Sequence, residues 1–283
     1  MSEHFIKNIE IKNFKCFKDF KAEGFGRVNL IGGKNNVGKT AFMEACFLST
    51  AIRVQDLYGM LLSIETHRNA INLLLFTRDR NQDLQNLIIK NINFTIIKTL
   101  NKVSITKMED GTIKIDIEDT ISSYSLSDLI NLLDIYLEFT KHKNSFNFIS
   151  QNSNANYTLN TLISELKLED KYNEFNRYLK EIFAVESIDF INNIPMLKTN
   201  GRYSELSGFG QGIKTFIDII SSMLLLPNEI IFIDEVENGI HYTHLDRLWE
   251  IILTISKQQN VQVFATTHSK ECIESYARVA KKL

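Results

Sequence analysis

The pattern of hydrophobic and polar positions predicts strands and then a helix at the start of the chain. Apolar and polar residues alternate between Phe5 and Phe20, which predicts an edge strand followed by a turn. A short apolar run, Val28–Ile31, predicts a strand, and residues 41–65 have helical character. Residues 1–65 are therefore expected to form the N-terminal part of an α/β core.

The middle of the chain has the pattern of a small antiparallel sheet followed by helices. Residues 93–118 contain three short runs that predict strands. Amphipathic helices are predicted over Leu126–Phe139 and Thr161–Phe183, with an exposed loop rich in Asn and Ser between them, from Lys141 to Asn156. We interpret residues 66–195 as an inserted β layer and helical subdomain.

Residues 196–283 return to long apolar segments and are expected to complete the core. A helix is predicted over Gly212–Leu226, and it ends there because Pro227 cannot continue it. Glu229–Ile233 is apolar on both faces, as in a buried parallel strand. Gln262–Thr267 is a second apolar strand and is expected to be its neighbour in the sheet.

Composition and charge indicate an ordinary globular protein. The chain has 283 residues, 44% of them hydrophobic and 23% charged, which is ordinary for a globular protein, and its net charge of −2 argues against a generic polyanion binder. Cys16 and Cys46 have apolar neighbours and are expected in the core. The N-terminus has no signal pattern and Ile217–Ile233 is too interrupted to span a membrane, so we expect a cytoplasmic protein.

Residues 33–40 read Gly-Lys-Asn-Asn-Val-Gly-Lys-Thr, which is a complete phosphate-binding loop. It lies between a predicted strand and a predicted helix, where backbone N–H groups face a di- or triphosphate. Lys39 is expected to reach the β- and γ-phosphates, and Thr40 to hold Mg²⁺. The residues expected to contact the nucleotide are Gly33, Lys34, Asn35, Asn36, Val37, Gly38, Lys39, Thr40 and Ala41.

A second set of candidate residues follows the two apolar strands of the C-terminal part. Asp234 and Glu235 come directly after the first strand, a pattern in which the first carboxylate holds Mg²⁺ and the second orients or deprotonates the attacking water. His268 ends the second strand and is expected beside the γ-phosphate. Gln55 and Gln82 are candidates only by position for completing the Mg²⁺ shell.

A glycine-rich segment, Ser204–Lys214, precedes the predicted helix of the C-terminal part. It contains three glycines within five residues and a serine, which can form an anion-binding nest at a helix N-terminus. Such loops are common before helices, so this signal is weak by itself. It lies about twenty residues before the acidic strand.

Together these segments resemble an ABC-type ATPase head of the RecF/SMC-like branch, and most closely the overcoming-lysogenization-defect (OLD)-like and related AAA-type bacterial ATPases. The resemblance implies a phosphate-loop NTPase core of ABC type. The motifs that carry it cover about a quarter of the chain: Ile9–Phe17, Gly33–Thr40, Leu206–Lys214, Ile231–His241 and Phe264–Lys270.

The resemblance also implies an activity and partners. ATP, with Mg²⁺, would be hydrolysed between two heads of a homodimer, with Ser207, Gly210 and Gly212 contacting the γ-phosphate of the partner's nucleotide. The output would be DNA repair or anti-phage defence, with DNA and a separate effector protein as partners. Phe209 departs from the family's signature sequence, and no nuclease domain follows His268, so we expect either a separate effector or a truncated chain.

Two other functions remain open from the sequence. One is a nucleotide-sensing module that binds ATP without hydrolysing it, against which the intact Glu235 and His268 argue. The other is the ATPase subunit of a membrane transporter, against which the unorthodox signature segment argues.

Overall fold

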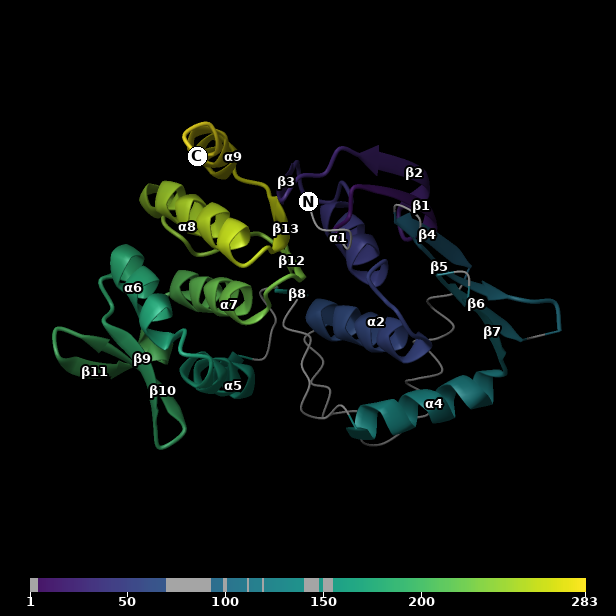
Figure 1. The fold of residues 1–283 in the computed structure, drawn as a ribbon, viewed down its shortest axis with the longest axis horizontal. Helices are drawn as coiled ribbons and strands as arrows, with labels where there is room; N and C mark the ends of the chain where they lie inside the picture. Colours follow the sequence, from purple (N-terminus) through teal and green to yellow (C-terminus); the bar gives the residue numbers. More distant parts are fainter. Residues whose placement is uncertain are drawn as a thin grey trace. The chain divides into compact units, whose positions relative to one another are not determined.

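The computed structural model describes residues 5–69, 93–98, 101–110, 112–118, 120–139, 148–149 and 155–283, which belong to two compact units (Figure 1). The first unit comprises Met1–Phe5, Arg27–Val37 and Phe146–Leu283, and the second comprises Ile6–Gly26 and Gly38–Ser145. The chain therefore passes from the first unit to the second inside the phosphate loop.

A parallel sheet forms the centre of the first unit. Its strands, in spatial order, are β3 (Val28–Gly32), β13 (Gln262–Thr267), β12 (Ile230–Ile233) and β8 (Phe148–Ile149). β12 and β13 are buried throughout and are neighbours, which confirms the prediction from their apolar pattern. The predicted exposed loop is wrong at Phe148 and Ile149, because these two residues are buried and pair with β12.

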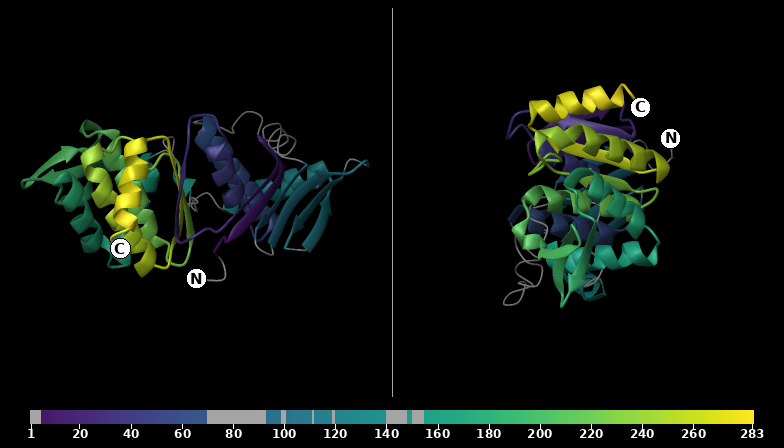
Figure 2. Two further views of the ribbon diagram at one scale, coloured as in Figure 1. Left: turned by 90° about the horizontal axis from the view of Figure 1, so that it is seen from above. Right: turned by 90° about the vertical axis from the view of Figure 1, so that its left-hand side faces the viewer.

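Five described helices pack in the same unit: α5 (Ala155–Leu168), α6 (Tyr172–Phe183), α7 (Gln211–Leu225), α8 (Leu245–Gln258) and α9 (Lys270–Ala280). The further views show α8 and α9 side by side (Figure 2). Trp249 on α8 is fully buried in their core. The single helix predicted over Thr161–Phe183 is wrong, because the chain breaks it at Asp170, which has a left-handed φ of 55°.

A small antiparallel sheet in this unit was not predicted. It consists of β9 (Ser187–Ile191), β10 (Ile194–Thr199) and β11 (Arg202–Glu205). Its two turns, Asn192-Asn193 and Asn200-Gly201, have positive φ at both residues, as tight hairpins require. β11 leads directly into the glycine-rich segment, so this sheet positions the start of that segment.

The second unit has a six-stranded antiparallel sheet with the order β2-β1-β4-β5-β6-β7. The predicted strands within residues 93–118 are confirmed, but the N-terminal strand β1 is not an edge strand, since it lies between β2 and β4. The strands are β1 (Asn8–Phe14), β2 (Phe17–Glu23), β4 (Phe94–Lys98), β5 (Asn101–Lys107), β6 (Ile113–Ile117) and β7 (Thr120–Tyr124). Its described helices are α1 (Lys39–Leu48), α2 (Val54–Asn69) and α4 (Leu126–Phe139), the last as predicted.

Helix α1 is fixed to the β1–β2 hairpin within this second unit. Lys15 in the hairpin turn donates to Glu44 of α1 at 2.6 Å, and the Glu44 side chain is only 2% exposed. Cys46 is buried as predicted, but Cys16 is exposed, because it lies in the turn beside Gly38 rather than in the core. Across the described helices of both units, none is long and apolar enough to cross a membrane.

Asp218 on α7 makes the stability of the protein depend on pH. Burial raises its pKa from 3.8 to about 7, while Lys214 opposes the shift. The folded state therefore holds this proton more tightly than the unfolded state, so stability falls as pH rises between about 4 and 7. One pKa unit is worth about 1.4 kcal/mol. We therefore expect Asp218→Asn to raise the free energy of unfolding at pH 8 by up to about 4 kcal/mol, and by much less at pH 5.

Urea unfolding of the wild type and the variant at the two pH values measures this difference. Asp246 provides a control of opposite sign, because hydrogen bonds from Arg278 and Ser275 lower its pKa to about 2. Asp246→Asn should lose stability at pH 8. An Asp218→Asn gain that is the same at pH 5 and pH 8 would show that the carboxyl group does not titrate in this range.

Candidate nucleotide and catalytic site

The phosphate loop has the strand and helix on either side that its sequence requires. β3 ends at Gly32 and α1 begins at Lys39. Within the loop, Asn36 and Gly38 have φ values of 62° and 97°, so the backbone turns sharply before the helix. Gly38 is the N-cap, and its carbonyl accepts from Phe42 N–H at 2.8 Å. A helix N-terminus that follows a tight glycine turn of this kind presents its backbone N–H groups to an anion.

Thr266, at the end of β13, connects the two acidic residues that follow β12. Its hydroxyl donates to Asp234 Oδ1 at 2.6 Å and accepts from the backbone N–H of Glu235 at 2.9 Å. Glu235 has a left-handed φ of 54°, which is uncommon for a residue that is not glycine and is found where the surrounding structure holds a side chain in a required direction. The carboxylate of Asp234 and the backbone of Glu235 thus have fixed positions at the carboxyl edge of the parallel sheet.

His268 lies in the turn between β13 and α9 and faces two carboxylates. Its Nδ1 is 3.6 Å from Glu235 Oε1 and 3.5 Å from Glu237 Oε1, and its side chain is about half exposed. The structure therefore brings His268 together with Asp234 and Glu235, although the histidine follows them by 33 or more positions in the sequence. Glu237 was not among the residues singled out from the sequence. The signal that could have found it is a third carboxylate two positions after Glu235, beyond Val236.

The glycine-rich segment begins at the end of β11, passes through a single turn of helix, Leu206–Gly208, and continues into α7. Ser207 and Gly210 are exposed, and the Ser207 hydroxyl donates to Glu205 Oε2 at 3.1 Å. Gly212 is instead buried, because its Cα lies against the backbone of Gly239 in the loop after β12. A Cβ added to Gly212 would be 2.0 Å from the carbonyl oxygen of Gly239. The segment and the loop therefore contact each other through two glycines, and the role of these residues toward a nucleotide remains a prediction.

We expect Gly212→Ala to destabilise the first unit strongly. The added methyl group would overlap backbone atoms that cannot rotate away, and overpacking of this kind costs about 1–3 kcal/mol, occasionally more. Thermal or urea unfolding measures the loss. Gly210→Ala is the matched control, because a Cβ at Gly210 meets no atom within 4 Å and the residue has extended backbone angles. Equal unfolding midpoints for the two variants would contradict the close Gly212–Gly239 contact.

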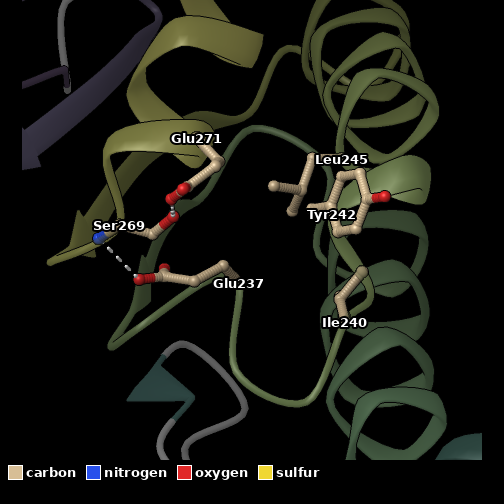
Figure 3. Close-up of a pocket in the computed structure, with 6 residues that line it drawn as sticks. All are labelled: Glu237, Ile240, Tyr242, Leu245, Ser269 and Glu271. Carbon is tan, nitrogen blue, oxygen red and sulfur yellow. Dashed lines mark hydrogen bonds between the residues drawn. The ribbon is translucent and has the colours of Figure 1, made fainter.

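A pocket of about 320 Å³ adjoins these residues (Figure 3). One side consists of Ser269 and Glu271 at the start of α9, where Ser269 Oγ donates to Glu271 Oε2 at 3.0 Å. Glu237 lies below Ser269 in the view, with its carboxylate directed toward Ser269. The lining residues are Glu237, Ile240, Tyr242, Leu245, Ser269 and Glu271.

Only one of the two candidates for completing the Mg²⁺ shell lies in the part of the chain that the structure describes. Gln55 lies in α2, and Gln82 lies outside the described residues. Asp234 supplies a carboxylate and Thr40 a hydroxyl, and oxygen ligands of this kind are those that Mg²⁺ prefers. Each of the two side chains is chemically suited to Mg²⁺, and their role as its ligands remains a prediction.

Comparison with known proteins supports this interpretation of the motifs. An "ATP/GTP phosphatase" of Helicobacter pylori is 27% identical over 331 aligned positions, covering 98% of this chain and 89% of the relative. An uncharacterized protein of Methanocaldococcus jannaschii is 35% identical over 104 positions, or 31% of this chain and 48% of that protein. A crystal structure of an SMC head bound to the C-terminal winged-helix domain of ScpA has a TM-score of 0.53 and 14% identity, and covers 96% of this chain and 91% of its own.

The structural likeness identifies the fold as that of an ABC-type, SMC-like head, as the sequence motifs predicted. The closer resemblance to OLD-like proteins remains a prediction. The family described as "AAA domain, putative AbiEii toxin, Type IV TA system" matches residues 28–274, which include the phosphate loop, the acidic pair and His268. The chain therefore belongs to this AAA-domain family and has the fold of an SMC-like ATPase head.

Proposed function

We propose that this ATPase head binds ATP with its phosphate loop, hydrolyses the β–γ bond and uses nucleotide-driven dimerisation as a switch. The observation that carries the proposal is the cluster of Asp234, Glu235 and His268 at the carboxyl ends of β12 and β13, in a chain whose β3–α1 connection is a complete phosphate loop. The Helicobacter pylori relative named as an ATP/GTP phosphatase supports the reaction class.

The phosphate loop would supply binding and charge balance. Backbone N–H groups of residues 33–41 would hold the phosphates, and the ammonium group of Lys39 would balance the negative charge on the β- and γ-phosphates. Thr40 and Asp234 would hold Mg²⁺, which neutralises charge on the phosphate oxygens when bound. These groups act mainly by positioning and by electrostatics, which dominate catalysis of phosphoryl transfer.

Glu235 and His268 would act on the attacking water and the γ-phosphate. The carboxylate of Glu235 would orient the water or accept its proton. The hydroxyl of Thr266 fixes both the backbone of Glu235 and the carboxylate of Asp234. The residue that would hold Mg²⁺ and the residue that would act on water are therefore held by the same group. His268, 3.6 Å from Glu235, would then donate to a phosphate oxygen or orient the carboxylate.

Dimerisation would complete the site. Ser207 and Gly210 are exposed in the segment that, in the resemblance, contacts the nucleotide of a second head, and the Gly212–Gly239 contact joins this segment to the loop after the acidic pair. A change at the γ-phosphate of one head could therefore alter the surface that meets the other. The expected assembly is a homodimer that forms with ATP and separates after hydrolysis.

The biological output would involve a separate effector, in DNA repair or in anti-phage defence. The related SMC head is bound to a domain of another protein, which supports a partner protein for this head as well. The family description includes a toxin–antitoxin system, which supports defence. DNA enters the proposal only through the resemblance to RecF/SMC-like heads.

Steady-state ATP hydrolysis tests the proposal, measured with Mg²⁺ or with EDTA, and with or without double-stranded DNA. Mg²⁺-dependent turnover that DNA stimulates would support a DNA-linked ATPase. Mg²⁺-dependent turnover that is the same with and without DNA would support the ATPase activity and favour a protein as the partner. ATP binding without turnover in any condition would overturn the hydrolytic function in favour of nucleotide sensing.

A further inference from the structure

Glu237 is a buried carboxylate that binds the turn carrying His268. It lies in the loop after β12, and its side chain is only 10% exposed. Its Oε1 accepts from the Thr267 hydroxyl at 2.7 Å, from His268 N–H at 3.1 Å and from Ser269 N–H at 3.2 Å. Figure 3 shows the last of these bonds crossing from the loop to the start of α9.

These three donors are consecutive residues, from the last residue of β13 to the N-cap of α9. Ser269 is the N-cap of α9, and its own hydroxyl accepts from Cys272 N–H at 3.1 Å. The first N–H groups at a helix start have no partner within the helix, and a negative charge is favourable there. The Glu237 carboxylate, which belongs to the loop after β12, accepts from the backbone N–H groups of His268 and Ser269 at this helix start. It therefore fixes the backbone at both residues.

That backbone fixes the point from which the His268 side chain extends. A histidine whose own N–H and whose following residue are both bonded to one carboxylate cannot shift without breaking charge-assisted hydrogen bonds, which are among the stronger ones in proteins. The imidazole then stands between Glu235 and Glu237, within 3.6 Å of both. The second oxygen of Glu237 is buried and has no hydrogen-bond partner among the described residues, so the carboxylate faces the turn through one oxygen.

We propose that Glu237 is a positioning residue, which holds the β13–α9 turn so that His268 faces Glu235 during ATP hydrolysis. The proposal rests on the proposed function for the catalytic roles of Glu235 and His268. It adds that the loop after the acidic pair and the turn with the histidine move as one body, because three hydrogen bonds to one carboxylate oxygen join them.

Glu237→Ala removes all three acceptor bonds and is the principal test. Amide hydrogen exchange at His268 should then be about 10- to 100-fold faster, the factor for losing a hydrogen bond to a charged acceptor. The kcat for ATP should fall about tenfold or more, while the Kd for nucleotide stays within about twofold, since small misplacements of catalytic groups cost rate rather than binding. Glu237→Gln keeps one acceptor oxygen and should be closer to the wild type in both measurements.

Glu271→Ala is the matched control, because it removes another carboxylate from the same pocket but leaves the three bonds intact. It should leave the exchange rate of the His268 amide and kcat unchanged. If Glu237→Ala does not fold, Thr267→Val is the second variant. It removes one of the three bonds to Glu237, together with the bond from Ser269 N–H to the Thr267 hydroxyl, with little change in volume, and should give smaller changes in the same direction.

The outcomes separate this inference from the proposed function. Unchanged exchange at His268 in Glu237→Ala would overturn the positioning role, whatever the ATPase activity. Faster exchange with an equal loss of kcat and of nucleotide affinity would also overturn it, in favour of general structural support. If the wild type has no ATP turnover but exchange at His268 is faster in Glu237→Ala, the loop and the turn are coupled as proposed. The link between that coupling and hydrolysis is then overturned.

Discussion

Replacing Lys39 with alanine is expected to lower ATP turnover at least about 100-fold, because the ammonium group balances charge that develops on the transferred phosphoryl group. Lys39 is the first residue of α1 and follows Gly38, whose φ of 97° sets the start of the helix. Alanine is a good helix former, so the substitution leaves α1 intact and removes only the charged side chain. Steady-state hydrolysis with Mg²⁺ measures the loss, and circular dichroism checks that the variant is folded.

Lys270 offers a matched control for this substitution. It is also a lysine at the first position of a helix, it is 85% exposed, and its ion pair with Glu274 lies on the surface. Lys270→Ala should keep turnover near the wild-type value. A folded Lys39→Ala protein with normal turnover would show that residues 33–40 do not bind the phosphates of the substrate.

The phosphate loop and the acidic strand could be predicted from the sequence because their chemistry is local. A phosphate loop needs fixed residues at adjacent positions, and strand and helix patterns on either side confirm its context. Likewise β12 and β13 are short, apolar on both faces and followed by polar residues, which is the pattern of parallel strands with a site at their carboxyl ends. The expectation that His268 lies at this edge of the sheet followed from the same rule, and its role beside the γ-phosphate remains a prediction.

The contacts that position these residues could not be predicted, because they join segments that are distant in sequence. The Gly212–Gly239 contact depends on two glycines 27 positions apart, and each alone is an ordinary glycine before or after an element. Glu237 forms its bonds to residues 30 to 32 positions later. No local periodicity records such pairs, since they depend on how the loop after β12 folds over the sheet.

The sequence-based prediction also differs from the structure in three elements whose local signals were weak or were not used. The two buried residues of β8 lie in a segment rich in Asn and Ser, so a two-residue strand gave no detectable alternation. The sheet β9-β10-β11 had a signal in its Asn-Asn and Asn-Gly turns, which favour positive φ, but its strands are short. Asp170 divided the predicted long helix, and a single aspartate is not a strong helix terminator in sequence.

The second large effect is expected from Glu235→Gln, which should slow hydrolysis about 100-fold or more while ATP remains bound. Glutamine has nearly the shape of glutamate, and the bond from the backbone N–H of residue 235 to Thr266 does not involve the side chain. The neutral amide cannot accept a proton from water, so the step after binding is blocked. ATP should therefore persist between two heads and hold them together, which size-exclusion chromatography with light scattering would show as an ATP-dependent dimer.

Glu229→Gln makes the same change at the opposite end of the same strand, where the residue is exposed just before β12, and it should keep both turnover and the wild-type mass distribution. Because the two variants share the loss of one charge, a dimer that appears only in Glu235→Gln must come from blocked hydrolysis and not from the altered net charge. If Glu235→Gln binds ATP but stays monomeric at high protein concentration, the nucleotide does not act by joining two heads, and the exposed Ser207 and Gly210 have no role in a second head's site. If it hydrolyses ATP at the wild-type rate, the base or water-orienting group must be sought elsewhere, and Glu237 becomes the carboxylate to test next because it also faces His268.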